Sequence, residues 1–152
     1  MNHDEAILRY STAKGYIQAC KMIVLSDHYK DQNVVATILP LHMLGGFALE
    51  LYLKAWLLGS GRSSKDVRGY GHDIKNLYDD AKTDGLREID KLKEMKDHFA
   101  DPHSDFTYRY IGPGDQMDNT NWPSAFRAFD ELDREVDGYL GASSSYGLQA
   151  GH

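Results

Sequence analysis

The fold is decided by residues 34–58, which read VVATILPLHMLGGFALELYLKAWLL and are the most apolar stretch of the chain. Apolar residues continue around all sides of this segment, so the sequence predicts a central helix that other helices cover. Pro40 lacks a backbone N–H and clashes with the preceding turn, so we expect it to kink the helix or to mark a later start. Gly45 and Gly46 are expected to let a neighbouring backbone approach closely.

The same stretch is long enough to cross a bilayer, at about 1.5 Å per residue. It contains Glu50 and Lys54, however, and placing these charges in lipid is unfavourable. The acid precedes the base by four residues, which is the favourable order for an ion pair along a helix. We therefore predict a buried core helix and no membrane contact.

Four further helices are predicted where apolar residues recur every three or four positions. A Gly-rich loop at 59–71 and a long irregular loop at 100–121 separate them. The predicted fold class is all-α: an antiparallel up-and-down bundle of about five helices, with the long irregular loop before the last one. The bundle spans residues 1–140, and the Gly- and Ser-rich residues 141–152 are predicted to be a flexible C-terminal tail. The further helices cover residues 4–25, 73–82, 86–99 and 122–140.

The chain of 152 residues has a formal net charge of −6 and one cysteine, Cys20. General DNA binding is not expected of such an acidic chain, because phosphate backbones reward clustered Lys and Arg. A lone cysteine excludes a disulfide within the chain, which fits a reducing compartment. The first residues are polar and acidic where a secretion signal is basic. The sequence therefore predicts a cytoplasmic protein.

Three short motifs resemble those of one known family. ALELYLKAWLLG at residues 48–59 looks like the second helix of the HEPN superfamily, GHDIKNL at 71–77 is similar to the start of its next helix, and YRY at 108–110 is similar to a segment before its last helix. Taken in this order, the resemblance runs from about residue 34 to residue 140. The resemblance implies a helical bundle that usually forms a homodimer, in nucleotide-related, toxin–antitoxin or defence systems.

The sequence departs from the HEPN nuclease pattern. Nuclease members of the family share an Arg, four to six residues and then a His near the last helix. Here the last predicted helix contains Arg127 and Arg134 but no His, and Arg68 precedes His72 by one residue too few. The resemblance therefore does not extend to ribonuclease chemistry, and we predict no catalytic residues.

The best candidate for a ligand site lies where the apolar helix ends and the next helix begins. One loop joins these helices, so His72 is expected to approach Glu50 or Lys54. One reading is a structural polar network, in which His72 or Asp73 caps the next helix. The other readings are a shallow anion or nucleotide site and, least favoured, acid–base catalysis by His72 with Glu50. The candidate ligand-binding residues are Glu50, Lys54, His72, Asp73, Tyr108 and Arg109.

Two other groups of residues have a weaker claim to function. The basic loop with Arg62, Lys65 and Arg68 is predicted to be a solvated linker, with RNA or nucleotide contact as the alternative, and it is not a P-loop. A second group invites a metal-site reading, but its two histidines do not share one helical face and Pro102 lies between them. We predict no metal and no cofactor. This second group consists of His98, Asp101, His103 and Asp105.

These observations lead to a hypothesis of function. The leading interpretation is a non-catalytic, HEPN-like binding or regulatory protein that forms a homodimer and binds a nucleotide, an RNA or a cognate toxin or antitoxin protein. One alternative is an enzyme with a degenerate or different site around Glu50, His72 and Arg109. A second alternative is a structural module for protein interaction. Converging side chains in an open cleft would favour the enzyme, and buried pairs would favour a scaffold.

Overall fold

The computed structural model describes residues 2–31, 34–105, 107 and 119–151, and within these ranges it contains helices and no strands. The predicted all-α helical bundle is thus confirmed. A single π-helical turn, η1, precedes the central helix α3. The elements are α1 (Asn2–Leu25), α2 (Asp27–Lys30), η1 (Val34–Ile38), α3 (Leu39–Gly59), α4 (Ser64–Gly69), α5 (Ile74–Thr83), α6 (Leu92–Ser104), α7 (Trp122–Leu140) and α8 (Ala142–Tyr146).

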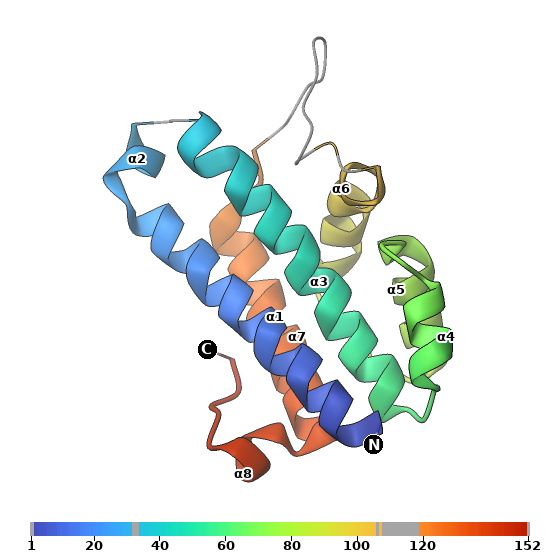
Figure 1. The fold of residues 1–152 in the computed structure, drawn as a ribbon. Coiled ribbons are helices and arrows are strands. Elements are labelled where there is room, and N and C mark those ends of the chain that lie inside the picture. The colour runs from blue at the N-terminus through green and yellow to red at the C-terminus, as the bar shows by residue number, and fades with distance from the viewer. Residues whose placement is uncertain (1, 32–33, 106, 108–118, 152) are drawn as a thin grey trace.

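Three long helices, α1, α3 and α7, lie along one another, and α1 runs opposite to the other two (Figure 1). The shorter helix α6 packs against α3, α5 and α7. The direction of α7 follows from its contacts with α3: Trp122 lies beside Gly45, and Leu140 lies beside Gly59, so the two helices run the same way. Helix α5 runs in the same direction as α3, because the short helix α4 first returns the chain toward the middle of α3.

Helix α3 lies at the centre, as its composition predicts. Most of its side chains are buried, among them Leu49, Tyr52 and Leu53. The stretch Ala36–Gly59 is long and apolar enough to span a membrane by length and composition, but 61% of its most apolar window is buried inside the bundle. Burial of this kind is what a core helix requires. On the facing helix α1, Cys20 is fully buried, and the loss of solvent raises the pKa of its thiol to about 12.

Pro40 marks a late start of the central helix. It lies in the first turn of α3, where its missing N–H has no helical partner to lose, and the chain before it forms the π-helical turn. Gly45 and Gly46 allow close approach, but of side chains rather than of a backbone. A Cβ on Gly45 would lie 3.0 Å from the Phe99 ring, and one on Gly46 would lie 2.7 Å from Nδ1 of His103.

The fourth predicted helix differs most from the structure. Residues 86–99 were expected to form it, whereas α6 spans Leu92–Ser104. Leu86 and Ile89 are buried as predicted, but they lie in the non-helical segment before α6. At the other end the helix continues past Pro102, which removes one backbone donor near the C-terminus without ending the helix.

Two segments predicted to be irregular contain short helices. The loop at 59–71 includes α4, whose first turn is capped by the Ser63 side chain. Within residues 141–152, α8 follows α7, and the backbone N–H of Gly151 donates to the carboxylate of Asp133 on α7. The tail thus returns to the bundle, and its flexibility stays a prediction.

Candidate functional site

The predicted pair on α3 is formed and buried. Lys54 Nζ donates to Glu50 Oε1 at 2.6 Å, and both side chains are less than a tenth exposed. Lys54 also donates to the backbone oxygen of Gly71 at 2.6 Å. The lysine therefore has two acceptors, and it fixes the loop before α5 against the central helix.

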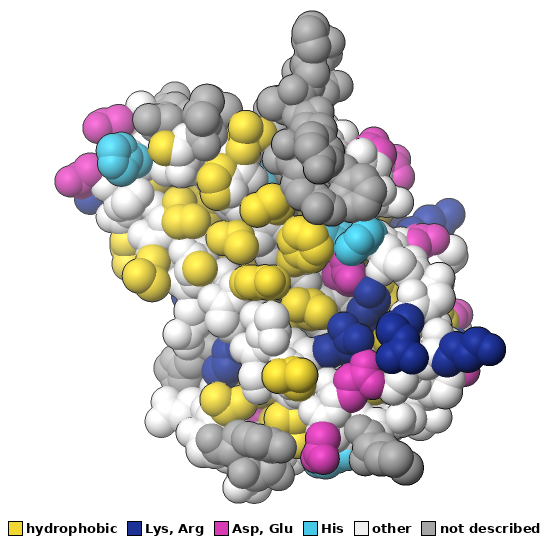
Figure 2. All heavy atoms as spheres, viewed as in Figure 1, with side chains coloured by type: hydrophobic (Ala, Val, Ile, Leu, Met, Phe, Trp, Pro, Cys, Tyr) yellow, Lys and Arg dark blue, Asp and Glu magenta, His cyan; other side chains and the backbone are white. Residues whose placement is uncertain are grey.

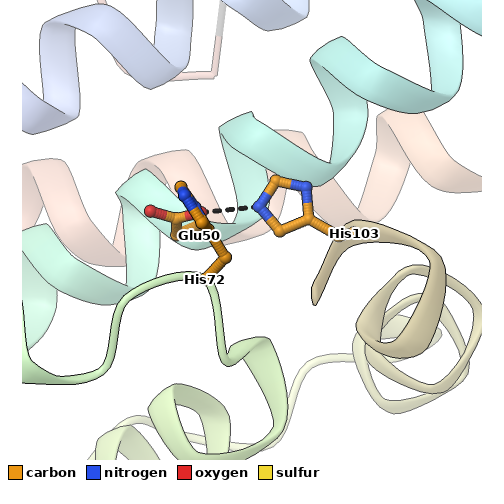
Figure 3. Close-up of side chains that lie close together, drawn as sticks. All are labelled: Glu50, His72 and His103. Carbon is orange, nitrogen blue, oxygen red and sulfur yellow. Dashed lines mark hydrogen bonds and ion pairs between the residues drawn. The ribbon is translucent and has the colours of Figure 1, made fainter. Parts of the chain in front are cut away.

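Two imidazoles meet the other oxygen of the same carboxylate (Figure 3). His72 Nδ1 lies 2.9 Å from Glu50 Oε2, and His103 Nε2 lies 2.6 Å from it. Since an ionised carboxylate only accepts hydrogen bonds, both ring nitrogens carry the hydrogen that faces Glu50. The three side chains come from α3, from the loop before α5 and from α6, so Glu50 joins three parts of the bundle.

Glu50 is charged despite its burial. Removal from solvent raises the pKa of its carboxyl group, but hydrogen bonds from His103, Lys54 and His72 lower this pKa by more, so that it falls to about 2. His103 is as buried as Glu50, whereas 37% of the His72 side chain is exposed. The cluster therefore has one side that reaches the surface, formed by His72.

Aromatic and glycine residues shape the space around the two imidazoles. The Phe47 ring meets His103 edge-on with 4.7 Å between centroids, and it meets His72 in the same way at 5.8 Å. Gly46, one turn before Glu50 on α3, leaves room for the His103 ring to lie against the helix. These neighbours hold both rings toward the carboxylate.

The structure separates the residues that the sequence grouped as candidates. It brings together Glu50, Lys54 and His72 as predicted. Asp73 has the capping role instead, since its side chain accepts from the backbone N–H of Asn76 at 3.0 Å. Tyr108 and Arg109 lie outside the described residues. Ligand binding by any of these side chains stays a prediction.

His103 is the member of the cluster that sequence reasoning did not connect with Glu50. Ending the fourth helix at Phe99, before Pro102, placed His103 in a loop. In the structure α6 includes both residues, and a spacing of four puts His103 on the same buried face as Phe99. Continuing the apolar stripe of α6 through the proline would have located it.

The residues of the proposed metal-binding group and of the basic loop do not stay together in the structure. His98 and His103 have different partners: His98 Nε2 lies 2.7 Å from Thr120 Oγ1, which in turn lies 3.1 Å from His42 Nε2. A cavity of about 270 Å³ adjoins His98 between α6 and the start of α7. In the basic loop, Arg62 is bound by Asp80 and Asp84, whereas Lys65 and Arg68 are exposed on α4.

A second buried carboxylate, Asp133 on α7, has a different set of partners. Lys14 of α1 donates to it at 3.1 Å, and the hydroxyl groups of Tyr10 and Tyr52 donate at 3.2 and 2.7 Å. The N–H of Gly151 completes the set. All the side chains of this network are buried.

No family model, no curated protein and no solved structure matches this chain.

Proposed function

We propose that this protein is a non-catalytic binding or regulatory protein of the HEPN-like type that works as a homodimer in the cytoplasm. The order of the motifs at 48–59, 71–77 and 108–110 supports the HEPN-like assignment. The observation that carries the proposal is an apolar surface on α1 and α3 (Figure 2). In that view hydrophobic side chains gather over the C-terminal half of α1 and the N-terminal half of α3.

The apolar surface consists of two matched stripes. Tyr16, Ala19 and Ile23 on α1 and Leu44, Phe47 and Leu51 on α3 repeat with the same spacing of three and four, and all six are partly exposed. The rings of Tyr16 and Phe47 lie 6.3 Å apart, so the stripes adjoin. Contiguous apolar surface of this kind is a common feature of protein interfaces.

A second copy of the chain is the partner that fits this surface. In a two-fold symmetric dimer the same patch meets itself, so two antiparallel helices of one copy would pack on two of the other. The partly exposed Met43 of α3 and the exposed Met22 of α1 extend the apolar area on either side of the stripes. A cognate toxin or antitoxin protein would then bind to another face of the dimer.

The mass of the full chain in solution tests the dimer. Light scattering after gel filtration is expected to give twice the chain mass of 17.2 kDa. Leu44→Glu places a charge in the stripe and is expected to give a monomer with unchanged helix content. Gln18→Glu, at an exposed position of α1, is the matched control and should stay dimeric. A monomeric wild-type protein, or a dimer unaffected by Leu44→Glu, contradicts the proposal.

Nucleotide or RNA binding is a second candidate function, and one observation favours it. Several Lys and Arg side chains gather over α4 and the start of α5, beside the apolar surface (Figure 2). Lys65, Arg68 and Lys75 are exposed there. Clustered cations of this kind attract phosphate groups even on an acidic protein. Lys54 is a poor phosphate ligand, because Glu50 and Gly71 already hold it.

A titration with nucleotides and short RNAs tests this second function. Binding that weakens with salt and is lost in Arg68→Glu combined with Lys75→Glu would support it. Lys30→Glu combined with Lys93→Glu, two exposed changes on α2 and α6, is the control with the same net charge. Absence of binding by the wild-type protein would remove nucleotides and RNA and would leave the dimer proposal standing.

The buried pairing around Glu50 argues against acid–base catalysis as the main function. Glu50 already accepts three hydrogen bonds, and its lowered pKa makes it a weak base near neutral pH. Assays for hydrolysis of RNA and nucleotides by the dimer, compared with His72→Gln, test the enzyme alternative.

A further inference from the structure

Three side-chain atoms of the kinds that coordinate metal ions lie close together in the bundle. Glu50 Oε2, His72 Nδ1 and His103 Nε2 all lie within 4.8 Å of one another (Figure 3). We infer that these three side chains form a binding site for one divalent transition-metal ion, with Zn²⁺ as the best fit. This inference goes beyond the proposed function and does not depend on it, since neither the dimer surface nor the cations of α4 and α5 supply a ligand atom.

The chemistry of the donor set selects the class of ion. Two imidazole nitrogens and one carboxylate oxygen are a common three-residue ligand set for Zn²⁺, and they also suit Fe²⁺, Co²⁺ and Ni²⁺. Mg²⁺ and Ca²⁺ require more oxygen ligands than this cluster offers. With three protein ligands a tetrahedral ion keeps a fourth position for water or another small ligand.

The carboxylate is already held in the orientation that binding requires. Lys54 occupies Glu50 Oε1 at 2.6 Å, so only Oε2 faces the two imidazoles. Lys54 also bonds Gly71, the residue next to His72, and thereby positions the loop that carries this histidine. Outer contacts of this kind orient metal ligands in proteins. The positive charge of Lys54 repels the metal ion, so we expect weaker binding than at a site with several anionic ligands.

Gly46 and Phe47 hold both imidazoles beside the carboxylate before any ion binds. Gly46 leaves space for His103 directly above α3, and Phe47 packs against both rings. The apolar ring also limits the access of water on that side. His72 is partly exposed, so an ion reaches the buried Glu50 and His103 from the surface beside it.

Binding requires small movements and a rearrangement of protons. A tetrahedral ion with bonds of about 2.0–2.2 Å separates its ligand atoms by about 3.3–3.5 Å. The two nitrogens lie 2.9 and 2.6 Å from Glu50 Oε2 and would move outward by less than about 1 Å. Each imidazole presents its lone pair to the ion and carries its remaining hydrogen on the other ring nitrogen. A doubly protonated imidazole first releases one proton to water.

Titration of the chelator-treated full chain with Zn²⁺ and with Co²⁺ tests the site. Calorimetry is expected to give one Zn²⁺ per chain, and Co²⁺ is expected to show the visible absorption of a four-coordinate ion with nitrogen and oxygen ligands. His72→Gln and His103→Gln should each weaken binding by about tenfold or more. The matched control is His98→Gln on α6, which should bind as the wild type does, because His98 faces Thr120.

Three results would overturn the site. These are no saturable binding by the wild type, equal binding by the wild type and the double variant of His72 and His103, and loss of binding in His98→Gln alone. If circular dichroism finds His103→Gln unfolded, His72→Gln decides, since His72 is partly exposed and Glu50 keeps its hydrogen bond from Lys54. A monomeric protein that binds Zn²⁺ would refute the dimer and leave the site intact.

Discussion

Two buried carboxylates, Glu50 on α3 and Asp133 on α7, each join several parts of the bundle and differ in their partners. Each accepts a hydrogen bond from a buried lysine, Lys54 in one case and Lys14 in the other. Glu50 takes its remaining bonds from two imidazoles, and one of these reaches the surface. Asp133 takes its remaining bonds from two phenols and a backbone N–H, all enclosed.

The difference in partners indicates that the Asp133 network stabilises the fold and that the Glu50 network can also bind a ligand. Phenols at ordinary pH are poor metal ligands and proton carriers, and burial beside Asp133 raises the pKa of Tyr52 further. Imidazoles bind metals and exchange protons near neutral pH. The Asp133 network is therefore expected to contribute stability alone, and the Glu50 network to contribute less stability and to bind a ligand.

The largest effect is expected from Asp133→Asn. This change leaves Lys14 charged and buried without its anion, which costs about 3–5 kcal/mol of unfolding free energy. Asp130→Asn on the same helix is the matched control: its pair with Lys21 is partly exposed, so the cost should be below about 1 kcal/mol. Urea denaturation measures both. Similar losses in the two variants would mean that the Asp133 network is not a scaffold.

Gly46→Ala tests the packing around the Glu50 network. The added Cβ would lie 2.7 Å from His103 Nδ1, so the ring must move. We expect a loss of about 1–3 kcal/mol and a weaker interaction of His103 with Glu50. Gly15→Ala on α1 is the control, because its Cβ meets nothing within 4 Å, and it should gain about 0.5–1 kcal/mol. Thermal unfolding of both variants would show whether the melting temperature falls for Gly46→Ala and rises for Gly15→Ala.

Deletion of residues 149–152 tests the part of the Asp133 network that the tail supplies. It removes the Gly151 donor and the backbone oxygen of Gln149 that accepts from Lys14. We expect a loss of about 1–2 kcal/mol, since water replaces these groups in part. Gln149→Ala keeps the backbone oxygen and should change stability by less than about 0.5 kcal/mol. An unchanged midpoint in urea after the deletion would indicate a flexible tail without structural effect.

The smallest effect on stability is expected from His72→Gln. The side chain is partly exposed, and Glu50 keeps its hydrogen bonds from Lys54 and His103, so the loss should stay below about 1 kcal/mol. Zn²⁺ should raise the melting temperature of the wild type and not that of this variant. A loss of several kcal/mol in the absence of metal would make His72 part of the scaffold and would remove the contrast with Asp133.

Local patterns predicted much of this fold. The apolar run of α3, the bounds of α7 at 122–140 and the pair of Glu50 with Lys54 follow from helical spacing, and the structure confirms them. The start of α6 was wrong, because Leu86 and Ile89 have helical spacing while the backbone around them is irregular. The spacing of apolar residues predicts which side chains are buried, but it does not predict whether the backbone that carries them is helical.

The candidate site was predictable only in part. One loop joins α3 to α5, so the approach of His72 to Glu50 follows from the sequence. The partnership of His103 with Glu50 depends on how α6 packs on α3 across 53 residues, and no local pattern specifies that. The Asp133 network is harder still, because its members come from α1, α3, α7 and the tail.

The claim that the Glu50 network is a ligand site while the Asp133 network is a scaffold is tested most directly by crystals of the full chain grown with Zn²⁺. Anomalous scattering at the zinc edge locates the ion without assumptions about the protein. We predict one strong peak per chain, bonded to Glu50 Oε2, His72 Nδ1 and His103 Nε2, and no peak at Asp133. A peak elsewhere, or none beside Glu50 at saturating Zn²⁺, would contradict it.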